Sequence, residues 1–218
     1  MTLSHAADLA WHAEKGFRWA ELPAPREGKA GFTLLPPEQT GIHFTNELDE
    51  HAIAANRVLA NGSGVAVGDF DGDGLPDIYF CSLTGHNQLY KNLGGWHFKE
   101  VTAAAGVGCA GRVCRGAVFA DVNGDGRLDL LVSTLGDGVL CFTNRGDGTF
   151  ADATESAGLS SHYGAMTLAL ADVDGNGTLD LFVANSRTDD VHDRPNLPGA
   201  MVDGKLVLAP EMRDRILV

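Results

Sequence analysis

Short apolar runs alternate with acidic, glycine-rich turns through the middle of this chain. The runs that follow the turns occupy residues 78–80, 130–132 and 181–183. Before each turn, a larger apolar residue precedes a small one, as in Val67-Gly68, Phe119-Ala120 and Leu170-Ala171. Runs of this length, rich in β-branched and aromatic residues and bounded by glycine and aspartate, are typical of strands that are buried on both faces. The pattern therefore predicts β-hairpins in which an acidic turn joins the two strands.

Two further strands are predicted after each of the first two hairpins. The first strands are expected over 64–68, 116–120 and 167–171, and the third strands over 88–91 and 139–143. After an Asn-x-Gly turn, a fourth strand is expected to begin near His97 and near Thr149. The repeating unit is thus a meander of four antiparallel strands.

The same unit recurs at a nearly constant spacing. The acidic turns begin at Asp69, Asp121 and Asp172, which are offset by 52 and 51 residues, and residues 92–107 match residues 144–159 at the same offset. Four strands in a repeat of roughly 40 to 50 residues describe a propeller blade. A parallel β-helix built on calcium-binding nonapeptides is the main alternative, but its period is far shorter. We therefore expect an all-β fold, a partial β-propeller of about two and a half to three blades with four-stranded antiparallel sheets.

The repeat also predicts how the chain is divided. We expect an N-terminal extension over 1–40, an outer strand of an incomplete blade with a linker over 41–63, a blade with the first loop over 64–115, a blade with the second loop over 116–166, an inner half-blade with the third loop over 167–187, and a divergent tail over 188–218. In the tail, Asp203-Gly204 between apolar residues predicts a hairpin with a tight turn.

Each acidic turn has the composition of a loop that binds a divalent cation. Oxygen side chains stand at positions 1, 3, 5 and 9 of a nine-residue motif, and glycines at positions 4 and 6 allow the chain to turn sharply enough for a backbone carbonyl at position 7 to join them. The predicted ligands are Asp69, Asp71, Asp73, Leu75 and Asp77; Asp121, Asn123, Asp125, Arg127 and Asp129; and Asp172, Asp174, Asn176, Thr178 and Asp180. A hard, all-oxygen ligand set favours calcium over zinc or copper. The sequence therefore predicts up to three Ca²⁺ ions.

An EF-hand is the obvious rival for an Asp-x-Asp-x-Asp-Gly string. It requires a bidentate glutamate at position 12 and helices on both sides. Position 12 is instead Phe80, Val132 or Val183, and apolar runs typical of strands follow the loops. The EF-hand reading therefore fails in all three copies.

Composition restricts the remaining function classes. The formal net charge of the 218 residues is −13, and ten of the 29 acidic residues lie in the three loops. Nucleic acid is an unexpected partner for such a chain, because no basic stripe is available for phosphates. No run approaches the roughly 18 apolar residues of a membrane span. The first residues also lack the apolar core of a signal peptide, and we expect that the natural leader is not part of this sequence.

The repeats resemble a known family. Residues 64–77, the strand 89–92 and the segment 98–102 with its trailing Ala-Gly-Val resemble the FG-GAP or VCBS repeats of integrin-α-like propellers, and most closely the cartilage acidic protein and ASPIC/UnbV group. The resemblance covers roughly residues 41–185. It implies a calcium-loaded propeller, commonly seven-bladed and usually secreted, that serves adhesion or protein interaction. Only two blades are complete here, and the ASPIC/UnbV C-terminal domain of that group is not found.

Our leading functional hypothesis is a non-catalytic, calcium-binding propeller segment with structural cations. We expect it to act outside the cytoplasm, extracellular or periplasmic, as an adhesion module or as an interaction module for a protein or a glycan. One alternative is part of a calcium-dependent enzyme acting on polysaccharides, for which only Trp96, His97, His86 and Arg115 could be nominated. Another alternative is a subunit of an oligomer or larger assembly in which a different chain completes the propeller.

Two short motifs remain open at this stage. Residues 145–147 spell Arg-Gly-Asp, a tripeptide that integrins recognise, although they occupy a turn position of the repeat. Cys109 and Cys114 lie together before the second blade and could form a disulfide in an extracellular protein, but four cysteines permit three pairings.

Overall fold

The computed structural model describes residues 10–21, 32–48, 53, 57–186, 199–202 and 205–208. The chain forms two compact units, residues 1–35 and 36–218, and each is described by itself. The second unit carries all three predicted cation loops.

The first unit contains a hairpin that sequence reasoning missed. Strand β1 (Trp11–Glu14) pairs antiparallel with β2 (Phe17–Ala20). Gly16 supplies the positive φ of 90° that the turn between them requires. His12 stacks on Trp19 with ring centroids 4.4 Å apart. The extension predicted over 1–40 therefore includes at least one ordered hairpin.

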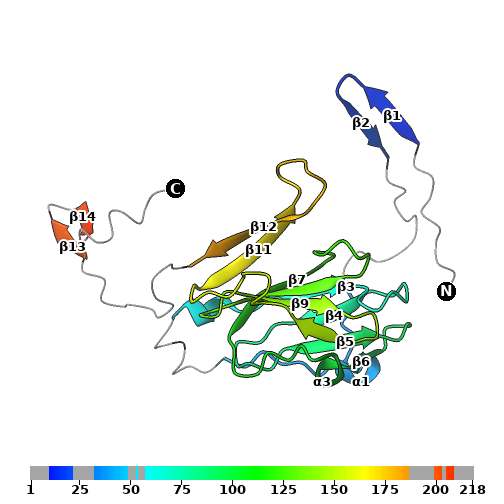
Figure 1. The fold of residues 1–218 in the computed structure, drawn as a ribbon, viewed down its shortest axis with the longest axis horizontal. Helices are drawn as coiled ribbons and strands as arrows, with labels where there is room; N and C mark the ends of the chain where they lie inside the picture. The colour runs from blue at the N-terminus through cyan, green and yellow to red at the C-terminus, as the bar shows by residue number, and fades with distance from the viewer. Residues whose placement is uncertain are drawn as a thin grey trace. The chain divides into compact units, whose positions relative to one another are not determined.

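The second unit contains two complete four-stranded sheets (Figure 1). The first sheet has the order β3-β4-β5-β6, formed by Val65–Gly68, Asp77–Phe80, Gln88–Asn92 and Phe98–Glu100. The second sheet places β7, β8, β9 and β10 in sequence order, formed by Cys114–Ala120, Asp129–Thr134, Val139–Asn144 and Phe150–Asp152. All neighbouring strands are antiparallel. We call these sheets the first and second blades.

The third repeat forms a single hairpin. Strand β11 (Ala165–Ala171) pairs with β12 (Asp180–Asn185), and we call this pair the third hairpin. In the tail, β13 (Gly199–Val202) pairs antiparallel with β14 (Lys205–Leu208), with Val202 opposite Lys205. The all-β prediction with partial propeller blades is confirmed.

The helical segments are short and lie in connections. They are α1 (Pro37–Thr40), the 3₁₀ helix η1 (Arg57–Asn61) and α3 (Thr102–Ala105). The hydroxyl of Thr102 accepts a hydrogen bond from the Leu89 N–H at 2.8 Å, which fixes α3 to the third strand of the first blade. None of these segments approaches the length or apolarity that crossing a bilayer would require, and the same holds for every other helix of the described residues.

The outer strand predicted near Ile42 is wrong. Residues 41–48 form no strand, and residues 49–52 lie outside the described part of the chain. The ring of Phe44 instead stacks on Phe80 at 4.8 Å, and the His43 N–H donates to the Tyr90 hydroxyl at 3.2 Å. The apolar residues that suggested a strand therefore cover one side of the first blade. A strand is stable only beside a partner strand, and the described residues offer this segment none.

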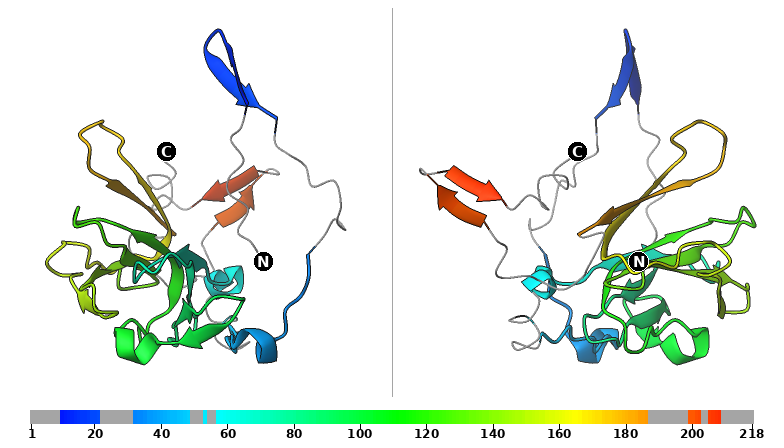
Figure 2. Two further views of the ribbon diagram at one scale, coloured as in Figure 1. Left: turned by 90° about the vertical axis from the view of Figure 1, so that its right-hand side faces the viewer. Right: turned by 60° about the vertical axis from the view of Figure 1, so that its left-hand side comes forward.

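Successive repeats pack side by side (Figure 2), and the contacts between them join β3 to β7 and β11 to both β7 and β8. The Gly64 N–H donates to the Arg115 carbonyl at 2.8 Å, so β3 and β7 lie in close contact. A Cβ atom on Gly68 would lie 2.9 Å from the Cβ of Phe119, so the small residue before the loop is required by its neighbour. One apolar cluster joins the first two blades and includes Tyr79, Leu89 and Leu130. A second cluster joins the second blade to the third hairpin.

Four free cysteines are buried in the blades, Cys81, Cys109, Cys114 and Cys141. The neighbouring Cys114 thiol lowers the pKa of Cys109. The disulfide that the sequence left open is not formed in this structure.

Candidate metal centres

The three predicted cation loops share a backbone that glycine makes accessible. Gly72 and Gly74 of the first loop have φ values of 77° and 84°, and the glycines at the same positions of the other loops are also left-handed. This conformation disfavours residues that carry a Cβ. It turns successive N–H groups toward the side chain at position 1.

The carboxylate at position 1 organises each turn. Asp69 accepts hydrogen bonds from the N–H groups of Gly72, Asp73 and Gly74 at 2.9, 3.1 and 2.8 Å. Asp121 accepts the corresponding three bonds, and these backbone donors lower its pKa. Backbone donors stabilise the charged form of a carboxylate. Each turn therefore holds an anionic side chain in place.

The aspartate at position 9 begins the second strand and is held from two sides in the complete blades. Asp77 is fully buried and accepts the N–H groups of Phe70 at 3.1 Å and Asn92 at 2.7 Å. Asp129 accepts equivalent bonds from Val122 and Asn144. Burial raises the pKa of Asp77 to about 6, and the charges of Asp71 and Asp73 add to that rise. A buried carboxylate beside two others is a position at which a cation is electrostatically favoured.

Positions 1, 3 and 9 converge in two of the three loops. Oxygens of Asp69, Asp71 and Asp77 all lie within 4.8 Å of one another, and the same is true of Asp172, Asp174 and Asp180. Within the described residues, these are the two groups of three or more acidic or metal-binding side chains that gather in this way. The second loop has Asn123 at position 3 and therefore has one carboxylate fewer, although an amide oxygen can also bind calcium.

The side chain at position 5 lies outside these groups. Asp73, Asp125 and Asn176 each accept the N–H of the residue two positions later, at 2.9, 2.9 and 2.8 Å. The predicted carbonyl ligands at position 7 belong to Leu75, Arg127 and Thr178, and no hydrogen bond to them is found among the described residues. The structure thus brings positions 1, 3 and 9 together, and the roles of positions 5 and 7 stay predictions.

Basic side chains lie against the first and second loops. The Lys91 ammonium contacts Asp71 and lies 3.0 Å from an oxygen of Asp73. These hydrogen bonds raise the pKa of Lys91 and lower the pKa of Asp73. In the second loop Arg127 pairs with Asp125, and no described cation pairs with the third loop. A cation seated among the first loop's carboxylates shows that these residues fit a positively charged ligand, and hard oxygen donors suit Ca²⁺.

Sequence reasoning missed two asparagines that brace the loops. Asn92 donates its backbone N–H to Asp77 and its side-chain Nδ2 to the Pro76 carbonyl at 2.8 Å. Asn144 donates Nδ2 to the carbonyls of Leu128 and Phe70, at 2.9 and 2.7 Å, and so reaches from the second blade to the first loop. The signal was present, because both residues begin an Asn-x-Gly turn in register. The sequence identified only the turn.

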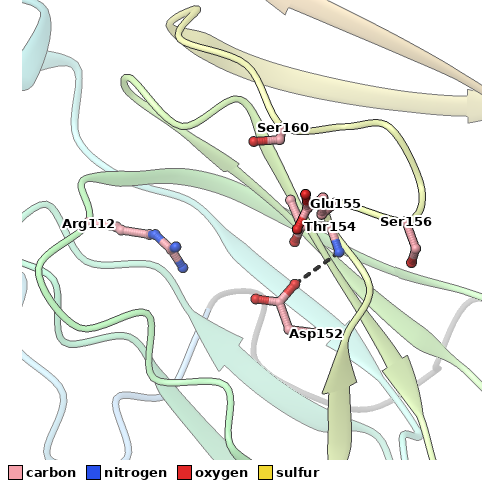
Figure 3. A pocket seen from close by; sticks show the side chains of 6 residues that line it. All are labelled: Arg112, Asp152, Thr154, Glu155, Ser156 and Ser160. Atoms are coloured by element: carbon pink, nitrogen blue, oxygen red, sulfur yellow. Dashed lines mark hydrogen bonds between the residues drawn. The ribbon is translucent and has the colours of Figure 1, made fainter.

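A separate hollow of about 720 Å³ lies at the edge of the second blade (Figure 3). It is lined by Arg112, Asp152, Thr154, Glu155, Ser156 and Ser160. Asp152 accepts the Thr154 N–H at 2.9 Å, and the Thr154 hydroxyl accepts the Cys141 N–H at 3.0 Å. A similar hollow in the first blade includes Glu100 and Thr102. These polar groups hold the end of each blade, and the hollow recurs because the repeat does.

The residues nominated for an enzyme are not gathered in one place. Trp96 and His97 follow the end of β5, whereas His86 precedes its start, and a five-residue strand separates its ends by about 15 Å. Arg115 is buried on β7, and its Nε and Nη1 have no hydrogen-bond partner. The Arg-Gly-Asp turn is exposed, but Asp147 accepts the backbone N–H and the hydroxyl of Thr149, at 3.0 and 2.6 Å. The Asp147 carboxylate therefore stabilises the turn.

Comparison with known families agrees with the repeat. Residues 69–132 and 121–183 each match the model of the FG-GAP-like repeat, and together they cover more than half of the chain. The chain belongs to the FG-GAP-like repeat family. Each match begins at the first aspartate of one loop and ends in the strand after the next loop, so the family match spans two successive FG-GAP loops.

Three curated relatives have the same name. Cartilage acidic protein 1 of Xenopus tropicalis is 29% identical over 164 residues, which are 66% of this chain and 25% of the relative. The Homo sapiens protein is 30% identical over 140 residues, 63% of this chain and 21% of the relative. The Mus musculus protein is 30% identical over 127 residues, 57% of this chain and 20% of the relative. The chain thus spans about a quarter or less of the length of these relatives.

Proposed function

We propose that this FG-GAP segment binds calcium at its three loops and acts as a non-catalytic interaction module. The ligands would be the fifteen residues predicted at positions 1, 3, 5, 7 and 9. The cations are structural, because each would fix the turn that joins the first and second strands of a repeat. The partners would be a protein or a glycan outside the cytoplasm.

The observation that carries this proposal is the convergence of three carboxylates in the first and third loops. Three carboxylates at this distance repel one another by several kcal/mol at a near-surface dielectric, and a dication reverses the sign of that interaction. The membership in the FG-GAP family supports the same conclusion, because each family match begins at the first aspartate of a loop. A non-catalytic role is favoured since carboxylates that bind a metal are poor general acids and bases.

Calcium titration by calorimetry tests the proposal directly. We expect three bound ions in the wild-type protein and two in each of the variants Asp69→Asn, Asp121→Asn and Asp172→Asn. Glu155→Gln is the matched control, because Glu155 is an exposed acid outside the loops and should leave all three ions bound. A hard but smaller ion, Mg²⁺, should bind more weakly at sites that accommodate calcium.

Thermal unfolding gives a second measurement. Calcium at ten times its dissociation constant adds about 1.4 kcal/mol per site, hence about 4 kcal/mol for three independent sites. The melting temperature should therefore rise with calcium and return with a chelator. An equal melting temperature in both conditions, together with no heat of binding at millimolar calcium, would contradict the proposal.

A further inference from the structure

We propose that the two open sides of the blade array bind each other, so that copies of this chain associate head to tail. One open side is the inner part of the first blade, at Val65 and Val67. The other is the free side of the third hairpin, at Phe182. The inference goes beyond the proposed calcium function and depends on the packing between repeats.

The first line of evidence is an equivalent position in the three repeats whose side chain becomes exposed in the third. Tyr79, Leu131 and Phe182 occupy the same place in the second strands of the three repeats, and they are 0%, 2% and 68% exposed. Tyr79 meets Phe119 of the second blade edge to face at 6.5 Å. Leu131 belongs to the cluster that includes Leu170 of the third hairpin. Phe182 is the next member of this series, and no further blade covers it among the described residues.

The second line of evidence is the complementary side. Val67, Phe119 and Leu170 are in register on the first strands of the three repeats. Phe119 and Leu170 are half-buried against the preceding repeat, whereas Val67 is 62% exposed. Val65, two residues earlier on the same face, is 52% exposed. The first blade therefore offers the surface that its sister repeats use to receive a neighbour.

The contact between these sides already occurs twice within one chain. Tyr79 with Phe119 and Leu131 with Leu170 are the two internal examples. The third pair in this series is Phe182 of one copy with Val67 of another. A second copy is thus a partner of known shape and chemistry, because it presents a surface equivalent to those that pack together within the chain. The two surfaces differ, so the association is heterologous and can extend or close into a ring.

The available area is limited by the segment that covers the outer part of the first blade. Phe44 lies on Phe80, and the His43 N–H binds Tyr90, so only the inner strand is free. Within the chain, the first strand of one repeat likewise contacts the repeat before it, as β7 contacts β3 and as β11 contacts β7 and β8. A small apolar interface of this kind gives weak association, with a dissociation constant of about 10 to 100 µM.

Sedimentation velocity with two face-specific variants tests the proposal. Val67→Glu damages one side and leaves Phe182 intact, whereas Phe182→Glu damages the other side and leaves Val67 intact. We expect the average mass of the wild-type protein to rise as its concentration is increased to about 200 µM, which is well above the expected dissociation constant. Each variant alone should remain monomeric, and an equimolar mixture of the two should form a one-to-one dimer. Leu93→Glu is the control, because Leu93 is 55% exposed in the turn after β5 and belongs to neither side.

Three outcomes would overturn the proposal. They are a wild-type protein that stays monomeric, a single variant that associates as the wild type does, and a variant mixture that stays monomeric. Circular dichroism establishes that each variant is folded, and Val67→Ser with Phe182→Ser replaces any glutamate variant that is not. The series is run with calcium and with chelator. A protein that binds no calcium can still associate, so the two proposals fail independently.

Discussion

The first and third cation loops share a motif but differ in what surrounds them. At position 2, Phe70 is 5% exposed and packs against Phe150 of the second blade, whereas Val173 is 80% exposed. At position 9, Asp77 is fully buried with two backbone donors, whereas Asp180 is half-buried and accepts only the Val173 N–H among the described residues. The first loop is held by its own blade and by the next one.

This difference shows that the surrounding structure can hold one local motif firmly in one place and loosely in another. The turn itself forms in both places, because position 1 accepts backbone N–H groups in both. The third strand of the blade and the neighbouring blade brace the first loop. We therefore expect calcium to order the third loop more than the first.

The largest expected difference is in the packing of position 2. Phe70→Ala should lower the free energy of unfolding by about 3 kcal/mol, because it removes a buried ring from the interface between blades. Val173→Ala at the equivalent position should change it by less than about 0.5 kcal/mol, since that side chain is exposed. Urea unfolding of both variants measures the contrast. Equal effects would mean that the first loop is not braced by the second blade.

Removal of the position-9 carboxylate should also separate the two loops. In chelator, Asp77→Ala leaves the buried N–H groups of Phe70 and Asn92 without an acceptor, and we expect a loss of about 2 kcal/mol. Asp180→Ala leaves one exposed N–H and should cost less than about 1 kcal/mol. Asp77→Asn is the matched control, because its carbonyl oxygen can still accept one of the two bonds. A larger loss at Asp180 would reverse the comparison.

The pH dependence of calcium binding should identify the buried carboxylate. The pKa of Asp77 is raised to about 6, so below this pH a proton must leave before calcium binds. The affinity of the first loop should fall about tenfold between pH 7 and pH 5. The stability of the metal-free fold has the opposite pH dependence. Burial favours the neutral form of Asp77, so its contribution to the free energy of unfolding is fully present below about pH 4 and is lost as the pH rises through 6.

The measurement uses a variant with Asp121→Asn and Asp172→Asn, in which only the first loop is intact. Calorimetry at pH 5, 6 and 7 gives the affinity of that loop. Adding Asp77→Asn should weaken binding and remove most of its dependence on pH over this range. The same affinity at pH 5 and pH 7 before that addition would exclude a raised pKa at Asp77.

The smallest expected effect concerns the ammonium beside the first loop. Lys91→Met removes a cation that competes with calcium for Asp71 and Asp73, so the affinity of this loop should rise about fivefold, which is about 1 kcal/mol. Thr143 occupies the equivalent position in the second blade, and Thr143→Lys should weaken the second loop by a similar factor. Calorimetry of the two variants checks both directions. An unchanged affinity in both would show that the ammonium moves aside without cost.

Much of the fold could be predicted because the same sequence pattern recurs in each repeat. The pattern of apolar residues around the acidic turns predicted the strands of both complete blades to within a few residues. Asp203-Gly204 predicted a hairpin in the tail, and β13 pairs with β14 there. The strand near Ile42 was wrong for the opposite reason, since its apolar residues pack onto a blade that is distant in sequence. The contacts of Lys91, Asn92 and Asn144 with the loops were missed for the same reason, because these residues reach the loops from the third strand.

The sequence by itself determined the acidic loops, the period of the repeat and the four-strand order. These depend on interactions within a hairpin or on a pattern that recurs. The tertiary structure alone decided which loop is braced, which side chains remain exposed and which carboxylate has a raised pKa. Tyr79, Leu131 and Phe182 occupy the same position in the repeat, and only the neighbour that packs against each one decides whether it is buried. Burial and electrostatics depend on that neighbour, and no local motif encodes it.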